Sequence, residues 1–130
     1  MKVVSKKSVF EDERGNIIDI LEGEVIEYVT IITSKKGAIR GNHYHKESVQ
    51  YTFVLKGSLQ ILTQMPGEEV RTTLLRTGDL VFSPPMEKHT LVAIEDSELL
   101  ILTRGPRGGN NYEKDTFRLE KSLTLSPASD

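Results

Sequence analysis

Short runs rich in β-branched residues, separated by turn residues, constrain the fold of this chain most. Glycine, proline, aspartate and serine interrupt these runs at intervals of about 8–12 residues, a spacing typical of β-sandwiches and β-barrels. No window of 11 or more residues has a convincing helical period. We therefore predict an all-β sandwich or barrel. Its expected strands lie at 25–33, 50–64 (broken at Lys56-Gly57-Ser58), 70–75, 80–83, 90–94 and 98–103.

Composition excludes several classes of protein. The chain has 130 residues, 37% of them hydrophobic, which suits one domain with a core. It contains no cysteine, which excludes disulfides, thiolate nucleophiles and cysteine-bound metal clusters. Its formal net charge of −2 gives no basic excess for nucleic acid or anionic membranes. There is no apolar run long enough for a membrane helix and no secretory leader, so we expect a cytoplasmic protein.

The three histidines are the first candidate functional residues. Two of them flank Tyr44, in the order His43, Tyr44, His45. In an extended strand, residues two apart point to the same face, so both imidazoles would project into one space. Histidine titrates near neutral pH, and its neutral form binds transition metals. The pair therefore indicates proton transfer or metal binding.

The spacing around these histidines resembles the two signature motifs of the cupin superfamily. The residues that carry the resemblance are Gly37, His43, His45, Gln50 and Gly57, then Gly78, Pro84 and His89. The resemblance implies a cupin-type double-stranded β-helix, a jelly-roll barrel with histidines in its mouth. We expect that barrel at 1–121 and a flexible tail at 122–130. Metal-binding cupins have glutamate where this chain has Gln50.

A second set of motifs resembles cupins that process nucleotide sugars. Residues 10–17 read Phe-x-Asp-x-Arg-Gly-x-Ile, and 40–46 read Arg-Gly-x-His-x-His-Lys, followed by Gln50. These motifs are similar to those of the 3,4-ketoisomerases of dTDP-4-keto-6-deoxyglucose, and more distantly to those of sugar epimerases. In the ketoisomerases, glutamine is the expected residue at the position of Gln50. The resemblance implies an isomerase or epimerase of a nucleotide-linked 4-keto-6-deoxy sugar that requires no cofactor.

The residue types suit that chemistry. Moving a ketone from C4 to C3 requires removal of the C3 proton and return of a proton at C4. We assign this proton transfer to His43 and His45, without choosing which is the base. Guanidinium groups bind phosphate oxygens, and aromatic rings stack on bases and sugars. The expected substrate-binding residues are Arg14 and Arg40 for the diphosphate, Gln50 for an imidazole or the substrate carbonyl, and Tyr112 for stacking.

Two other function classes remain open. One is a metal-dependent small cupin, either an epimerase or a dioxygenase-like enzyme. Its Zn, Mn, Fe, Ni or Cu ion would be bound by His43, His45, Gln50 and His89. The other is a non-catalytic module that binds a sugar. We also expect a homodimer, because sheet edges must be covered and the run 2–10 could pair with a neighbour's sheet.

Overall fold

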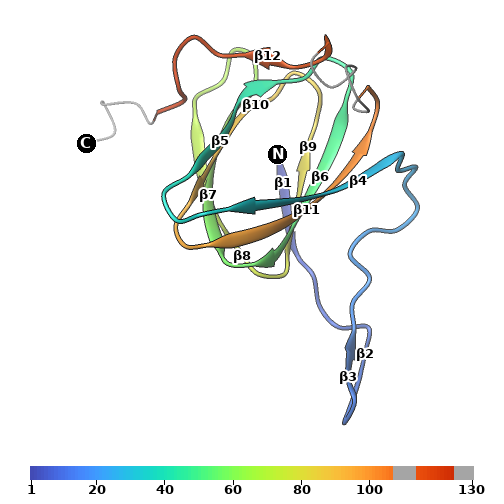
Figure 1. The fold of residues 1–130 in the computed structure, drawn as a ribbon. Helices are drawn as coiled ribbons and strands as arrows, with labels where there is room; N and C mark the ends of the chain where they lie inside the picture. The colour runs from blue at the N-terminus through green and yellow to red at the C-terminus, as the bar shows by residue number, and fades with distance from the viewer. Residues whose placement is uncertain (107–113, 125–130) are drawn as a thin grey trace.

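The protein is an antiparallel β-barrel made of two five-stranded sheets that face each other (Figure 1). The computed structural model describes residues 1–106 and 114–124, so most of the expected tail at 122–130 lies outside the described residues. The predicted all-β sandwich or barrel is confirmed. Within the described residues, no helix has the length and apolar character needed to cross a membrane.

The first sheet has the strand order β1-β9-β6-β11-β4. Its β1 strand, which belongs to the run 2–10, pairs with β9 of the same chain and forms one edge of this sheet, so pairing of that run with a neighbour's sheet stays a prediction. The central position of β6 and β11 gives each of them two hydrogen-bonded neighbours. The bounds are β1 Lys2–Ser5, β4 Tyr28–Ser34, β6 Val49–Lys56, β9 Asp79–Ser83 and β11 Ser97–Arg104.

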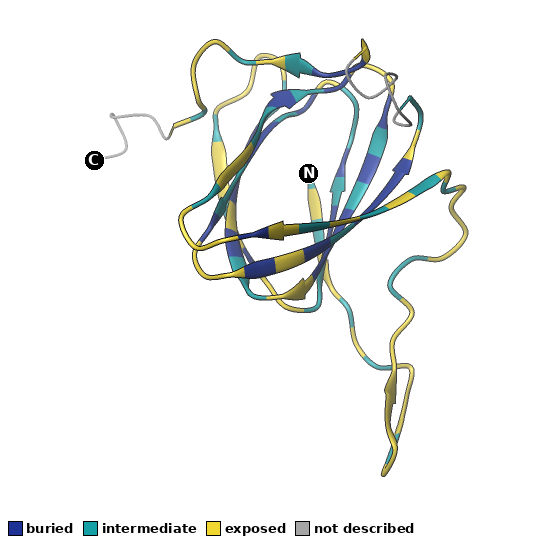
Figure 2. Ribbon diagram, in the orientation of Figure 1, coloured by how far each residue is buried: buried dark blue, intermediate teal, exposed yellow. Residues whose placement is uncertain are grey.

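The second sheet has the order β12-β5-β10-β7-β8, and a separate hairpin joins β2 to β3. Figure 1 shows this hairpin projecting away from the barrel, and Figure 2 shows it largely exposed. The bounds in the sheet are β5 Ile39–Tyr44, β7 Ser58–Gln64, β8 Arg71–Arg76, β10 Lys88–Ala93 and β12 Phe117–Arg118. The hairpin strands are β2 Phe10–Asp12 and β3 Gly15–Ile17.

The core lies between the sheets and follows the period of two that strands impose. In β7, for example, Leu59, Ile61 and Thr63 are buried while the residues between them are more exposed. Both sheets contribute aliphatic side chains to one cluster, which fills part of the barrel and leaves the histidine end polar. The cluster consists of Val54, Leu59, Ile61, Leu75, Val81, Ala93, Leu99 and Ile101.

Candidate functional site

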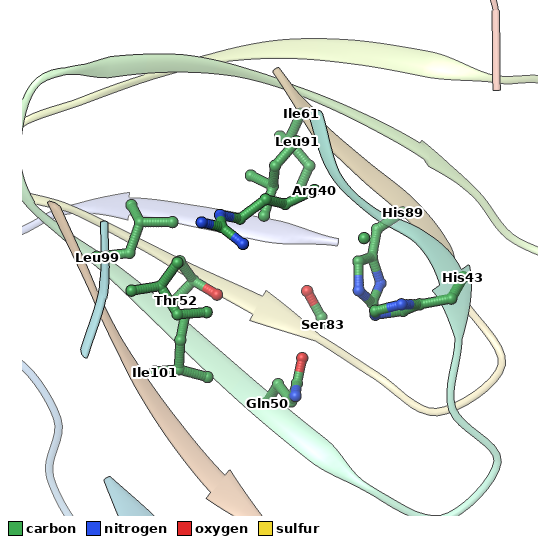
Figure 3. Close-up of a pocket in the computed structure, with 12 residues that line it drawn as sticks. Arg40, His43, Gln50, Thr52, Ile61, Ser83, His89, Leu91, Leu99 and Ile101 are labelled. Carbon is green, nitrogen blue, oxygen red and sulfur yellow. The ribbon is translucent and has the colours of Figure 1, made fainter. Parts of the chain in front are cut away.

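A cavity of about 140 Å³ lies between the two sheets, beside the apolar core (Figure 3). One wall carries histidines from β5 and β10, and the facing wall carries hydroxyl and amide groups from β6 and β9. The lining residues are Ile32, Arg40, Gly41, His43, Gln50, Thr52, Ile61, Ser83, His89, Leu91, Leu99 and Ile101.

The three histidines come together as one buried cluster. The ring centroids of His43 and His45 are 4.7 Å apart, those of His43 and His89 4.7 Å, and those of His45 and His89 5.7 Å. His43 and His45 are on the same face of the chain, as the spacing of two predicts, and His89 is the register partner of His43 on β10. Sequence spacing therefore predicted the pair, and strand pairing brings in the third ring.

A β-bulge in β5 explains why Arg40 shares the inner face with the histidines. Arg40 pairs with Leu91 and His43 pairs with His89, while Asn42 is left without a partner in the register. Residues three apart on a regular strand point to opposite faces, but one extra residue restores the same face. Asn42 and Gly41 adopt the positive φ values that this bulge needs, 59° and 82°.

Gly41 is required for a second reason, which is its close approach to His89. A Cβ atom at Gly41 would lie 3.0 Å from the His89 carbonyl oxygen and 3.2 Å from the His89 ring carbon Cδ2. A side chain there would push on the strand that carries the third histidine. The sequence Arg-Gly-Asn-His thus encodes the bulge, the close contact and the inward direction of His43.

Hydrogen bonds to main-chain carbonyls orient two of the imidazoles. His45 Nδ1 lies 2.8 Å from the Asp115 carbonyl oxygen, and His89 Nδ1 lies 3.3 Å from that of Glu87. Because a carbonyl only accepts, Nδ1 is the protonated nitrogen and Nε2 keeps its lone pair. Burial, followed by the neighbouring His45, lowers the pKa of His89 to about 4, so His89 is neutral at pH 7.

The facing wall contains residues that sequence analysis did not single out. Ser83 is the register partner of Gln50, and both are buried, as is Thr52 two residues along β6. Their side chains line the cavity opposite His43 and His89 (Figure 3). Serine and threonine in strands carry no sequence signal of their own, and only the pairing of β6 with β9 reveals this polar row.

The predicted arginines have different positions. Arg40 lines the cavity, where its Nε donates to Ser34 Oγ and a terminal nitrogen donates to the Thr33 carbonyl, both at 2.8 Å. Arg14 is on the β2–β3 hairpin, where it pairs with Asp12 at 2.6 Å, and it does not line the cavity. Tyr112 lies outside the described residues.

The histidine cluster fits a transition metal in its donor chemistry. One nitrogen from each of His43, His45 and His89 lies within 4.8 Å of the others. Metal-binding histidines typically donate their second ring nitrogen to a carbonyl or carboxylate, as His45 and His89 do here. Gln50 lies across the cavity and is a neutral amide. Among the residues that the structure describes, the candidate metal site therefore consists of three imidazoles without a carboxylate.

Comparison with known proteins places the chain in a family. The family model described as the polysaccharide biosynthesis C-terminal domain matches residues 10–117. The chain belongs to this family. Comparison with curated protein sequences gives no match.

Solved structures that are similar to this chain include sugar-nucleotide enzymes. A double mutant of the 3,4-ketoisomerase QdtA from Thermoanaerobacterium thermosaccharolyticum, in complex with TDP, is 26% identical, with a TM-score of 0.74 over 91% of this chain and 86% of that chain. The TDP-quinovose 3,4-ketoisomerase WlaRB from Campylobacter jejuni is 20% identical, with a TM-score of 0.76 over 91% and 92%.

The dTDP-4-dehydrorhamnose 3,5-epimerase from Sulfolobus tokodaii is also 20% identical, with a TM-score of 0.69 over 82% of this chain and 70% of that chain. At this identity, the epimerase and WlaRB support the fold alone. The expected cupin jelly-roll barrel, and its similarity to the ketoisomerase and epimerase cupins, are confirmed.

Proposed function

We propose that this protein is an isomerase or epimerase of a nucleotide-linked 4-keto-6-deoxy sugar, and that it transfers protons through histidines. The observation that carries the proposal is the buried pair His43 and His45, whose ring centroids are 4.7 Å apart; His43 lines the cavity, and His45 packs beside it without lining the cavity itself. The Nδ1 contact of His45 leaves its Nε2 able to accept a proton. The fold shared with QdtA, a ketoisomerase crystallised with TDP, supports the substrate class.

The proposed reaction needs a base, an acid and stabilisation of negative charge. One imidazole removes the C3 proton, which is acidic because C3 lies next to the C4 ketone. The electrons form an enediolate, a proton is added at C4, and the proton of the C3 hydroxyl passes to the C4 oxygen, so that C3 becomes the ketone and C4 carries the hydroxyl. In this scheme Arg40 binds the anionic diphosphate, and Gln50 hydrogen-bonds the substrate carbonyl. No electrons leave the substrate, so the scheme needs no redox partner.

The test is hydrogen exchange at C3 of a TDP-linked 4-keto-6-deoxy sugar in deuterated water. We expect His43→Asn and His45→Asn to reduce exchange by at least about 100-fold while TDP binding persists. Tyr44→Phe is the matched control, because Tyr44 lies between the two histidines yet stacks on Phe117, 5.3 Å away. Full exchange in both histidine variants would refute the proposal. Saturable binding without exchange by the wild type would instead indicate a binding module.

The histidine cluster also supports a second candidate function, a metal-dependent cupin enzyme. His43, His45 and His89 would bind the ion, which would act as a Lewis acid on a substrate carbonyl. Elemental analysis of protein purified without chelator or a nickel column tests it. Near-stoichiometric metal, lost in each histidine variant, would support this candidate, whereas metal-free and active protein would exclude it.

A homodimer is the assembly we propose, and the outer face of the first sheet supports it. The register aligns apolar residues across the strands in two rows, and Val29 and Ile31 at one end are 65% and 67% exposed. Such a face favours association. One row is Ile31, Leu100, Phe53, Leu80 and Val4, and the other is Val29, Leu102, Tyr51 and Phe82. Phe53, Leu80 and Leu102 are already buried in the single chain, so the exposed apolar part of this face is at its ends.

Light scattering with size-exclusion chromatography tests the dimer. We expect Ile31→Glu to shift the protein to monomer, and Leu74→Glu, on the outer face of the second sheet and 42% exposed, to leave the dimer intact. A wild-type monomer at micromolar concentration would refute the dimer. The cytoplasmic location and the 1–121 domain boundary stay predictions.

A further inference from the structure

The segment 114–119 runs alongside β5, the strand that contains His43 and ends one residue before His45. Its β12 pairs with β5, with Phe117 opposite Tyr44 and Arg118 opposite His43. The Leu119 amide donates to the Asn42 carbonyl at 3.0 Å. This segment therefore lies beside β5 from the bulge at Asn42 to Tyr44. It does so although His45 and Asp115 are 70 positions apart in sequence.

Asp115 fixes this segment to the turn that follows β5. Its carboxylate accepts hydrogen bonds from the amides of Lys46 at 3.0 Å, Glu47 at 3.2 Å and Ser48 at 2.9 Å. It also accepts one from the Ser48 hydroxyl at 2.8 Å. Asp115 is 4% exposed, so these donors replace the water that a carboxylate would otherwise bind.

The Asp115 carboxyl group stays ionised at neutral pH, so its hydrogen bonds to the turn 46–48 are retained there. Burial alone would raise the pKa of this carboxyl, but the hydrogen bonds from Ser48, Lys46 and Glu47 outweigh burial and hold the pKa below its usual value. The group stays ionised at neutral pH and keeps all its acceptor sites. The turn 46–48 and the segment 114–119 are therefore held together in the working state of the protein.

The same residue also contacts His45, through a different atom. The Asp115 carbonyl oxygen lies 2.8 Å from His45 Nδ1, so the position of the Asp115 backbone determines which imidazole nitrogen carries the proton. We propose that Asp115 is a positioning residue for the reaction, because its carboxylate anchors the backbone whose carbonyl holds His45 in the Nδ1–H form. This inference rests on the proposed proton transfer by His45.

Asp115 should act on the chemical step more than on binding. Asp115 does not line the cavity, and it contacts the histidine cluster through the His45 ring, so we expect it to affect the substrate through His45. Loss of its carboxylate would release the carbonyl and let His45 populate the other neutral tautomer, in which Nε2 carries the proton and cannot accept another. We therefore expect kcat to fall while KM changes little.

The experiment compares Asp115→Asn with two other variants of the full chain. Ser48→Ala is the milder change, since it removes one donor and keeps the carboxylate. Asp79→Asn is the matched control, because Asp79 also accepts a backbone amide hydrogen bond, from Arg76 at 2.8 Å, in a turn that does not contact the histidines. One readout is the protonation of each His45 ring nitrogen by 15N NMR, assigned with His45→Asn, and the other is steady-state kinetics.

We expect wild type and Asp79→Asn to show only the Nδ1–H form of His45. Asp115→Asn should show a mixture of the two neutral tautomers of His45, with kcat lowered at least about tenfold. In Ser48→Ala, both the tautomer ratio and kcat should be intermediate between those of wild type and Asp115→Asn. An unchanged tautomer with unchanged kcat in Asp115→Asn would overturn the inference, as would a mixed tautomer in the wild type. If the wild type has no activity, the proposed function fails, while the NMR comparison still decides whether Asp115 positions His45.

Discussion

The tripeptide Arg-Gly-Asn occurs twice in this chain and has two different structures. At 14–16 it lies at the turn of the β2–β3 hairpin, whose strands pair only with each other. At 40–42 it lies in β5, which pairs with β10 and β12. The first copy projects from the barrel and the second lines its cavity (Figure 1).

The two arginines show what the neighbouring strands contribute. The side chain of Arg14 is 79% exposed, and it folds back on Asp12 two residues away. Arg40 instead donates to Ser34 and Thr33 from another strand. Both arginines were predicted to bind a diphosphate because each lies in a motif and its guanidinium group can bind phosphate oxygens. The same local sequence makes a surface turn where it has one partner strand, and a site wall where it has two.

The largest effect we predict is a difference in stability between alanine substitutions at Gly41 and at Gly15. Gly41→Ala should lower the free energy of unfolding by about 2–5 kcal/mol, because it combines positive-φ strain with crowding of the His89 backbone. Gly15→Ala should cost less, about 1–2 kcal/mol, because it has positive-φ strain at 134° but no crowding, since a Cβ there meets nothing within 4 Å. Chemical denaturation measures both. Equal losses would show that the hairpin is integral to the folded barrel.

The local part of the site could be predicted from the sequence. Spacing of two in His43-Tyr44-His45 placed both imidazoles on one face, and the runs at 50–64, 80–83 and 98–103 became β6, β7, β9 and β11. These features depend on the period of a strand, which neighbouring residues alone determine. The motif spacing also placed His89 with the pair.

The long-range part could not be predicted. The bulge at Asn42 becomes visible only in the register of β5 against β10, and Ser83 joins Gln50 only because β9 lies beside β6. Asp115 resembles any other aspartate in sequence, yet its carboxylate accepts hydrogen bonds from the turn that directly follows His45. Such roles arise from partners tens of residues away.

A second prediction concerns pH near the copy of the tripeptide at 40–42. His89 contacts Gly41 and has a pKa of about 4, against 6.5 for an ordinary histidine. Between these values the unfolded chain binds a proton that the native chain does not, so stability is complete above about pH 6.5 and falls as pH decreases. The lowered pKa of His89 corresponds to a loss of about 3 kcal/mol in the free energy of unfolding by pH 4.

Denaturation of wild type and His89→Gln between pH 7 and pH 4 isolates this contribution. In the variant, the free energy of unfolding should depend less steeply on pH, because the contribution of His89 is missing. The carboxyl groups titrate equally in both proteins. Glu87, whose pKa is raised chiefly by burial, acts with the opposite sign and cancels in the difference. Parallel pH profiles for the two proteins would contradict a buried, neutral His89.

A third prediction compares the two arginines in binding. Arg40→Ala should weaken TDP affinity by about 10- to 100-fold, the range for loss of a charged hydrogen bond, and Arg40→Lys should recover part of it. Arg14→Ala should stay within about twofold of wild type. Isothermal titration calorimetry measures all three. A larger loss in Arg14→Ala than in Arg40→Ala would move the diphosphate site to the hairpin.

The smallest effect should come from Asp12, the partner of Arg14. The side-chain hydrogen bond from Arg14, followed by its backbone amide, lowers the pKa of Asp12. Its stabilising contribution is therefore present above the usual carboxyl pKa of 3.8 and is lost as pH falls through the lower native value. Since the pair is exposed and screened by salt, Asp12→Asn should leave the thermal midpoint at pH 7 unchanged.

Thermal unfolding of Asp12→Asn beside Gly41→Ala checks this expectation. The hairpin of this chain exposes Val9 by 61%, Phe10 by 51% and Ile17 by 56%, so a second copy of the chain is the surface that could bury it. Two results together would mean that the hairpin is packed in the proposed dimer. The thermal midpoint of Asp12→Asn would fall as the protein is diluted, and it would fall as far as the midpoint of Gly41→Ala. In that case the Arg-Gly-Asn of the hairpin would depend on a further partner strand, as the copy in β5 does.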